Sequence, residues 1–340
     1  MLLAGVATVV GIALCPLAAA GGKVMSAGRS NVAVCIGHHQ IRLPAGADAT
    51  VTATYAGLRV VDEGAANWGD IESSLNARAE RAKSSASPRS ARAEAIYRAA
   101  GGDPDKAFAA SGLVGFDVSD HEAIIAEHVD KSSEFAFEAH RLYDGRHFIF
   151  QGKHNEAGSY ASVREGVRRS VSRFTPLPPN EIPKSNGFCT GNGVFALKDR
   201  EDVGGDAQLY VTFPEYPGVK FSLNLYGLVK RSEEPSFLER VGRDLVELAG
   251  FGGKVRTLHR GSREYAGQKG QLVAVSMPAE DGSGQRACKY FWHAAGKPLD
   301  PFLPEIEAEL MTDTDGTSVD ADTIEALWQQ IMGSLQARGP

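Results

Sequence analysis

The sequence predicts an α+β protein of two similar modules, each a mostly antiparallel sheet with helices on one face. Three observations predict this class: a cysteine-bearing strand around Cys35 and again around Cys189, many short alternating runs joined by turn residues, and amphipathic segments in both halves. A Pro-rich run, typical of an extended linker, precedes the second cysteine strand. We therefore expect domains at residues 23–178 and 179–340, after an N-terminal segment at residues 1–22.

The elements of the first half follow from side-chain periodicity. Residues 32–43 and 50–61 alternate apolar and polar side chains and predict one strand each. Asn67 precedes apolar residues at helical spacing, so we expect it to be the N-cap of a helix. Strands are also expected at residues 114–118 and 123–129.

A hairpin is the clearest local signal in this half. Apolar and polar residues alternate from Phe135 to Tyr143 and again through Phe148 and Phe150, with Asp144-Gly145 between the two runs. Asp-Gly at this position predicts a type I′ turn, because both central residues of that turn need a positive φ. Apolar residues at helical spacing over residues 160–174 then predict the helix that closes the first module.

The second half is predicted to repeat this plan. Its expected elements are a strand around Cys189, strands at residues 209–213, 219–226, 255–258, 271–277, 286–293 and 305–311, a helix from about Pro235 to Leu248, and a C-terminal helix capped by Ser318 or Asp320.

Composition and charge limit the function classes. The chain has 340 residues, 43% hydrophobic and 23% charged, which is typical of a globular protein with enough length for two cores. The formal net charge of −6 lies entirely in the second half. A nucleic-acid partner is therefore not expected.

The N-terminal segment predicts export. The first twenty residues carry no charge, and Ala18-Ala19-Ala20 is typical of a signal-peptidase site. A cleaved signal, a retained anchor and a lipidated Cys15 are the three alternatives. Export places the remaining cysteines in an oxidising compartment, so we expect one disulfide and one thiol among Cys35, Cys189 and Cys288. Their spacing does not select the pair.

Motifs of enzyme chemistry are not found in the sequence. It has no G-x-S-x-G elbow, P-loop, H-E-x-x-H or zinc spacing, and the Gly-rich run Thr190-Gly191-Asn192-Gly193 precedes a strand and not a helix. His38 and His39 are adjacent on a predicted strand, so their side chains should point to opposite faces and not to one ion. No cofactor and no metal are expected.

Two clusters of polar residues have alternative interpretations. One is either a cross-strand functional cluster or a solvated strand surface, and we expect the latter: His121, Glu122, Glu127, His128, Glu138 and His140. The other is the acidic stretch between Lys297 and Arg338, which contains no basic residue. It is either an ordinary solvated surface or a negative patch for a basic partner. Asp313-Thr314-Asp315-Gly316 lacks the spacing of a calcium loop.

Several motifs together resemble one protein family. They are Cys35-Ile36-Gly37 leading to Pro44, Gly187-Phe188-Cys189 with a Gly-rich step, Arg256 to Gly270, Tyr290-Phe291-Trp292, Gly296-Lys297-Pro298, Leu327-Trp328 and the tail Arg338-Gly339-Pro340. In this order they resemble the immunity proteins of type VI secretion lipase effectors, the class-four lipase immunity family. His38-His39 departs from the family pattern of Arg followed by an aromatic residue, and the tail only approximates its Arg-Pro.

The resemblance implies a periplasmic protein without catalytic activity. Such a protein would clamp the lid or cap of a phospholipase of the α/β-hydrolase type, and would meet a membrane only through an N-terminal anchor. It also implies a Cys35–Cys189 disulfide; the effector-binding residues are not specified. Two alternatives are an exported hydrolase with an unrecognised site and an envelope adaptor or solute-binding protein. A deep pocket with convergent acid and base groups would favour the former, and a ligand-sized cavity between the modules the latter.

Overall fold

The computed structural model describes residues 22–25, 31–85, 91–103, 112–128, 134–154, 159–178, 181–197, 205–230 and 255–339. Residues 1–21 of the expected export segment and the helix expected between Pro235 and Leu248 lie outside these residues. Over the described part, strands predominate and pair antiparallel, which confirms the expected mostly antiparallel α+β class.

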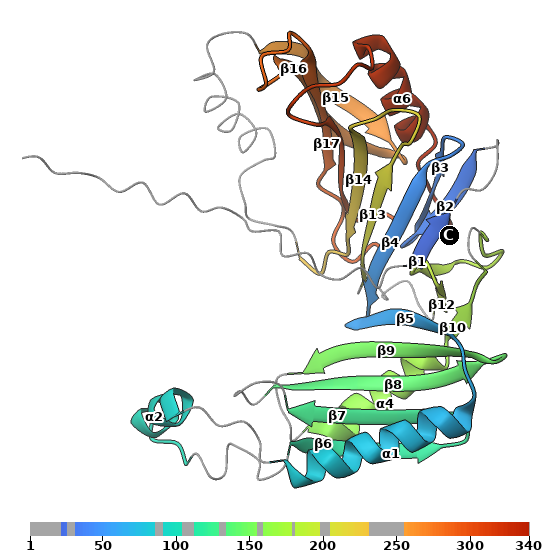
Figure 1. The fold of residues 1–340 in the computed structure, drawn as a ribbon, viewed down its shortest axis with the longest axis vertical. Helices are drawn as coiled ribbons and strands as arrows, with labels where there is room; N and C mark the ends of the chain where they lie inside the picture. The colour runs from blue at the N-terminus through green and yellow to red at the C-terminus, as the bar shows by residue number, and fades with distance from the viewer. Residues whose placement is uncertain are drawn as a thin grey trace, which may run out of the picture.

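One sheet of 13 strands extends through the described part of the molecule (Figure 1). Twelve of its strands have the spatial order β15 (Arg256–Tyr265), β16 (Gln268–Pro278), β17 (Arg286–Ala294), β18 (Glu305–Thr312), β14 (Val219–Tyr226), β13 (Gly205–Thr212), β4 (Asp48–Tyr55), β5 (Leu58–Ala65), β9 (Arg146–His154), β8 (Phe135–Tyr143), β7 (Glu122–His128) and β6 (Leu113–Ser119). The remaining strand, β1 (Gly22–Met25), pairs with β4.

This sheet crosses the boundary expected between two modules. β4, from the first half, pairs along its whole length with β13, from the second half, in a register that runs from Asp48–Thr212 to Tyr55–Gly205. β4 and β5 share only two pairs, so the sheet turns sharply between them, and β5 to β9 lie crosswise below β4 in Figure 1. The two separate sheets that the sequence predicts are therefore joined into one, while the division at residue 178 stays a prediction.

Two three-stranded sheets complete the fold. One has the order β10 (Phe174–Pro176), β12 (Gly193–Ala196) and β11 (Gly187–Cys189). The other has the order β19 (Gln336–Ala337), β3 (His39–Leu43) and β2 (Val32–Ile36). The last strand of the chain thus pairs with the first hairpin.

Two stretches predicted as single strands are hairpins. Residues 32–43 are interrupted at Gly37, with φ 52°, and residues 50–61 at Ala56 and Gly57, with φ 51° and 76°. Two consecutive positive φ values are the geometry of a type I′ turn, and the expected Asp144-Gly145 turn has it too. Alanine rarely adopts this conformation, so the Ala56-Gly57 turn left a weak signal in the sequence.

Four helices are described: α1 (Trp68–Ser84), α2 (Ala91–Ala99), α4 (Tyr160–Val171) and α6 (Ala321–Gly333). α1, α4 and α6 pack against the sheets, whereas α2 stands away from them in Figure 1. The expected N-caps are confirmed, because Asn67 accepts from the Asp70 amide and Asp320 from the Thr323 amide, each at 2.9 Å. Helices on one face were expected. Instead, the α1 side chains pack with Ile125, and the α4 side chains share a core with Ile124, so the two helices cover opposite faces of this part of the sheet.

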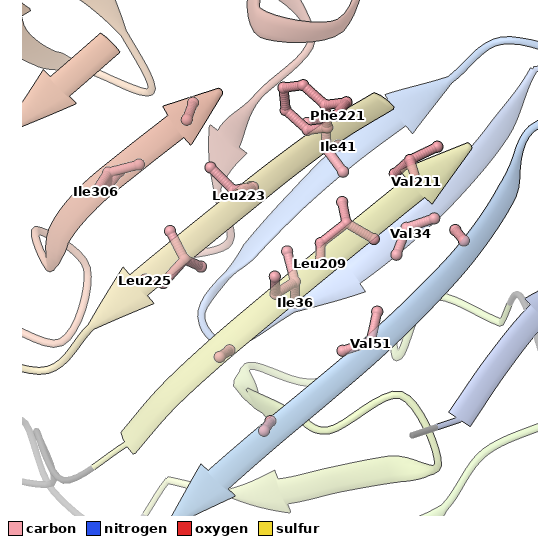
Figure 2. Packing of buried hydrophobic residues seen from close by; sticks show 14 of the residues in the cluster. Val34, Ile36, Ile41, Val51, Leu209, Val211, Phe221, Leu223, Leu225 and Ile306 are labelled. Atoms are coloured by element: carbon pink, nitrogen blue, oxygen red, sulfur yellow. The ribbon is translucent and has the colours of Figure 1, made fainter. Parts of the chain in front are cut away.

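The main core lies between the large sheet and the β2–β3 hairpin. Figure 2 shows Leu209 and Val211 of β13 and Leu223 of β14 pointing toward Ile36 and Ile41 of that hairpin. All five side chains are fully buried. The opposite face of the same strands is thereby left to polar side chains.

Candidate functional site

A groove of about 520 Å³ lies where β4 and β5 diverge, on the face of the sheet opposite the β2–β3 hairpin. Strands from both halves of the chain form it. Its lining residues are Thr50, Thr52, Ala53, Thr54, Arg59, Asp206, Ala207, Gln208, Tyr210, Asn224 and Tyr226.

The alternation of side chains along each strand positions this lining. On β13, Leu209 and Val211 enter the core shown in Figure 2, so Gln208 and Tyr210 must point to the groove. Cross-strand pairing then brings the polar residues into rows. Gln208 stands opposite Thr52 on one side and Asn224 on the other.

These rows contain both hydrogen bonds and exposed aromatic rings. Gln208 Nε2 donates to Asn224 Oδ1 at 2.8 Å. Tyr210 and Tyr226 are 46% and 38% exposed. Tyrosine is enriched at the energetic centres of protein interfaces, since it buries a large area with little loss of conformational freedom.

One side of the groove is acidic. Asp206 stands opposite Tyr226, which in turn stands opposite Glu305 on β18. Burial raises the pKa of Asp206, although its carboxylate accepts a hydrogen bond from the Gly227 amide at 3.2 Å. Burial also raises the pKa of Tyr226, and the charges of Glu307, Asp206 and Glu305 raise it further. A partner with basic side chains suits this surface.

The disulfide that the resemblance implies, Cys35–Cys189, is present in the structure. It joins β2 to β11, with a Cα–Cα distance of 5.8 Å. Two backbone hydrogen bonds between Gly37 and Cys189, at 2.8 and 3.0 Å, reinforce the connection. Cys288 is a free, buried cysteine. The hairpin behind the groove is thus covalently tied to the β10–β12–β11 sheet.

The C-terminal Arg338 covers this disulfide. Its side chain is buried and donates to Cys35 Sγ at 3.0 Å, to Cys189 Sγ at 3.1 Å, and to the carbonyl oxygens of Pro183 and Ser185 at 2.7 and 2.9 Å. Burial lowers its pKa. The guanidinium thus joins the chain terminus, the disulfide and the segment that enters β11.

Arg338→Ala is expected to lower the free energy of unfolding by about 2 kcal/mol, because it leaves buried carbonyl oxygens without their donor. Urea unfolding of the two proteins measures the difference. Gln336→Ala is the control, since Gln336 lies two residues earlier with an exposed side chain. Equal stabilities of the two variants would contradict the proposed contribution of the guanidinium.

His38 and His39 are both buried, and neither belongs to the groove. The His38 ring lies 5.2 Å from Phe188 and 5.5 Å from Phe302, measured between centroids. His39 is fully buried, and neither of its ring nitrogens has a hydrogen-bond partner. Burial, with a contribution from His38, lowers the pKa of His39 to about 3. Both residues are core histidines.

The structure brings together only part of the predicted histidine and carboxylate cluster. Arg78 of α1 forms ion pairs with Glu127 and Glu138, and Glu138 also lies 3.3 Å from His140. The neighbouring His140 ring and the Arg78 guanidinium lower the pKa of Glu138 to about 2. His147, which the sequence did not indicate, stacks on His140. This network connects α1 to β7 and β8, and none of its residues lines the groove.

Several acidic side chains of the C-terminal stretch form ion pairs with basic residues of neighbouring strands. Glu309 pairs with Lys289 at 2.6 Å, and Asp313 with Lys220 at 2.6 Å. Oxygen and nitrogen donors of His293, Glu305 and Glu307 lie within 4.8 Å of one another, a spacing that a divalent cation could use. His293 already contacts Glu305 at 2.8 Å. Most of this stretch is therefore consistent with an ordinary solvated surface whose acidic side chains pair locally.

The Gly-rich run after Cys189 forms a turn. Gly191 has a φ of 85°, and Thr190 Oγ1 donates to the Gly193 carbonyl at 3.2 Å. Asn192 Nδ2 donates to the Val60 carbonyl at 3.2 Å, which attaches the turn to β5. It therefore connects the small sheet to the large one.

The groove itself was not predicted. Its residues come from strands of both halves, and threonine, glutamine and tyrosine on a strand face give no functional signal. The only indication in the sequence was the alternation that made one face of residues 50–61 polar.

A tyrosine-bearing surface on an antiparallel sheet is of the kind that suits a protein-binding protein. Among the residues that the structure describes, no helix is long and apolar enough to cross a membrane. Residues 181–340 match the family described as Tle cognate immunity protein 4 C-terminal domain. This match over residues 181–340 confirms the resemblance stated from the sequence.

Solved structures share the fold over nearly the whole chain. The apo structure of the immunity protein TplEi of the type VI secretion system from Pseudomonas aeruginosa has a TM-score of 0.72 and 18% identity, covering 91% of this chain and 97% of that one. The Tle4–Tli4 complex contains a chain with a TM-score of 0.73 and 17% identity, at the same coverage. TplEi with an "L" peptide has a TM-score of 0.68 and 18% identity, covering 92% and 99%. No curated protein sequence matches the chain.

Proposed function

We propose that this protein is a periplasmic immunity protein that binds and inhibits a cognate type VI secretion lipase effector. It has no catalytic role of its own in this proposal. The family of its C-terminal half and the fold it shares with immunity proteins support the assignment. The groove on the bent sheet is the observation that supports the location of the binding site.

The groove is suited to a protein surface and not to a small substrate. It is open, and the exposed rings of Tyr210 and Tyr226 stand in it beside a row of carboxylates. We propose that these rings pack on the lid or cap of an α/β-hydrolase effector while the acids pair with its basic residues. An effector held there could not admit lipid to its active site.

Rigidity of the surrounding structure supports the same function. The Cys35–Cys189 disulfide and Arg338 fix the hairpin that underlies β13 and β4. A surface that is already ordered loses less conformational entropy on binding. The N-terminal export signal, cleaved or retained as an anchor, remains part of the proposal.

The test is inhibition of the cognate lipase by the purified protein. Tyr210→Ala/Tyr226→Ala is expected to weaken inhibition by about 30-fold or more, the effect of losing one or more interface anchors of about 2 kcal/mol. Val118→Ala is the matched control, because Val118 is also 38% exposed but lies on β6, at the far edge of the sheet.

Three results would contradict the proposed function or the proposed interface. Full lipase activity with the unmodified protein in excess would remove the inhibitor function. Equal inhibition by the tyrosine variant and the Val118 control would leave the function but move the interface elsewhere. Hydrolysis of phospholipid by the protein alone would instead favour the exported-hydrolase alternative.

A further inference from the structure

A second and larger cavity, of about 720 Å³, lies away from the groove. The Ala56-Gly57 turn, the end of β9 and one side of α4 line it, and it is open to solvent on one side. Its volume is within the range of small-molecule sites. It lies entirely within structure contributed by the first half of the chain, so it is not part of the proposed effector interface.

The floor of this cavity is apolar. Leu58, Phe137 and Val167 line it, and each is at least nine-tenths buried. Gly152 leaves room for the Phe137 ring, because a Cβ at that position would lie 2.3 Å from it. The floor can therefore receive a hydrocarbon chain without rearrangement of the sheet.

The rim is basic. Lys153, His154, Arg169 and Arg173 line the cavity, and no Asp or Glu is among the described lining residues. The Arg173 guanidinium lies 5.8 Å above the centre of the Tyr55 ring. This concentration of positive charge around an apolar floor suits a ligand with an anionic head group.

Other arginines of α4 differ from those at the cavity. Arg164 pairs with Asp117 at 3.0 Å, and Arg168 with Glu122 at 3.2 Å. Within the described part of the chain, no carboxylate forms an ion pair with Lys153 or Arg169. The helix thus pairs Arg164 and Arg168 with carboxylates of β6 and β7, whereas Arg169, which forms no ion pair with a described residue, lines the cavity.

Gly166 gives an independent indication. It lies in the interior of α4 and lines the cavity, and a Cβ there would meet nothing within 4 Å. Glycine within a helix costs about 1 kcal/mol relative to alanine. Since no neighbour requires the glycine, its effect is to enlarge the cavity beside the basic rim.

We infer that this cavity binds an anionic amphiphile, a molecule with one carboxylate or phosphate head group and a hydrocarbon chain. The chain lies on the floor formed by Leu58, Phe137 and Val167. The head group lies between Lys153 and Arg169. This site is separate from the groove and does not depend on the proposed function.

Calorimetric titration of the full protein tests the site with four probes: dodecanoate, dodecyl phosphate, dodecanol and inorganic phosphate. At least one charged amphiphile is expected to bind, and whichever of the two binds more tightly identifies the head group. Dodecanol and inorganic phosphate are each expected to bind at least about tenfold more weakly than that amphiphile, because dodecanol lacks the anionic head group and inorganic phosphate lacks the hydrocarbon chain. Equal binding of dodecanol, or equal binding of inorganic phosphate, would overturn the inference, as would no binding of either amphiphile.

Two variants locate the ligand. Gly166→Phe fills the cavity and is expected to abolish binding, while Ala161→Phe, at an exposed position of the same helix, retains it. Lys153→Gln/Arg169→Gln is expected to weaken amphiphile binding at least about tenfold. Arg42→Gln is the control and should have no effect, because Arg42 is also exposed but lies outside the cavity. Unchanged binding by both cavity variants, with near-UV spectra showing an intact fold, would place the ligand elsewhere and overturn the assignment.

Discussion

Cys35→Ser/Cys189→Ser is expected to lower the free energy of unfolding by about 5 kcal/mol. The bonded cysteines are 154 residues apart, and a covalent loop of this length removes much of the conformational entropy of the unfolded chain. The loop encloses β4 to β9 as well as α1 and α4, so the loss should affect the whole first half. Urea unfolding measures it.

Reduction of the unmodified protein provides the control for this variant. Dithiothreitol should shift the unfolding midpoint of the natural sequence toward that of the double serine variant and leave the variant unchanged. A midpoint of the natural sequence that does not respond to the reductant would contradict the stabilising role of the bond.

The second large effect is a loss of stability in acid that originates at His39. Its pKa is lowered from 6.5 to about 3 by burial, so the unfolded chain binds a proton at a pH where the folded protein does not. The stabilising contribution is complete above pH 6.5 and is lost as the pH falls toward 3. Between pH 7.5 and 5 this amounts to about 2 kcal/mol.

His39→Phe keeps a ring of similar shape and removes the titration. The free energy of unfolding of this variant is expected to fall by about 2 kcal/mol less than that of the natural sequence over the same interval. His147, whose pKa burial lowers to about 4, titrates in both proteins and cancels in the comparison. The same pH dependence in both proteins would show that His39 is not the origin.

Local signals in the sequence predicted local structure well. Asn67 and Asp320 are caps because their side chains accept from an amide three residues later, a relation that needs no knowledge of the fold. The Asp144-Gly145 turn could be predicted equally well, since its backbone geometry favours these residue types.

Long-range pairing could not be predicted in the same way. Nothing in residues 48–55 specifies that this strand pairs with residues 205–212, because any half-buried strand presents the same alternation. The continuous sheet, and with it the groove, depends on that pairing. The buried positions of His38 and His39 also depend on contacts with the end of the chain and with distant aromatic residues such as Phe188.

The position of β19 has a consequence for the order of assembly. The first hairpin obtains its third strand, and its disulfide obtains the Arg338 guanidinium, only from residues at the far end of the chain. Contacts between such distant positions form slowly, since a very long loop must close first. A chain synthesised from its N-terminus therefore keeps this corner of the structure incomplete until residues 336–338 are released.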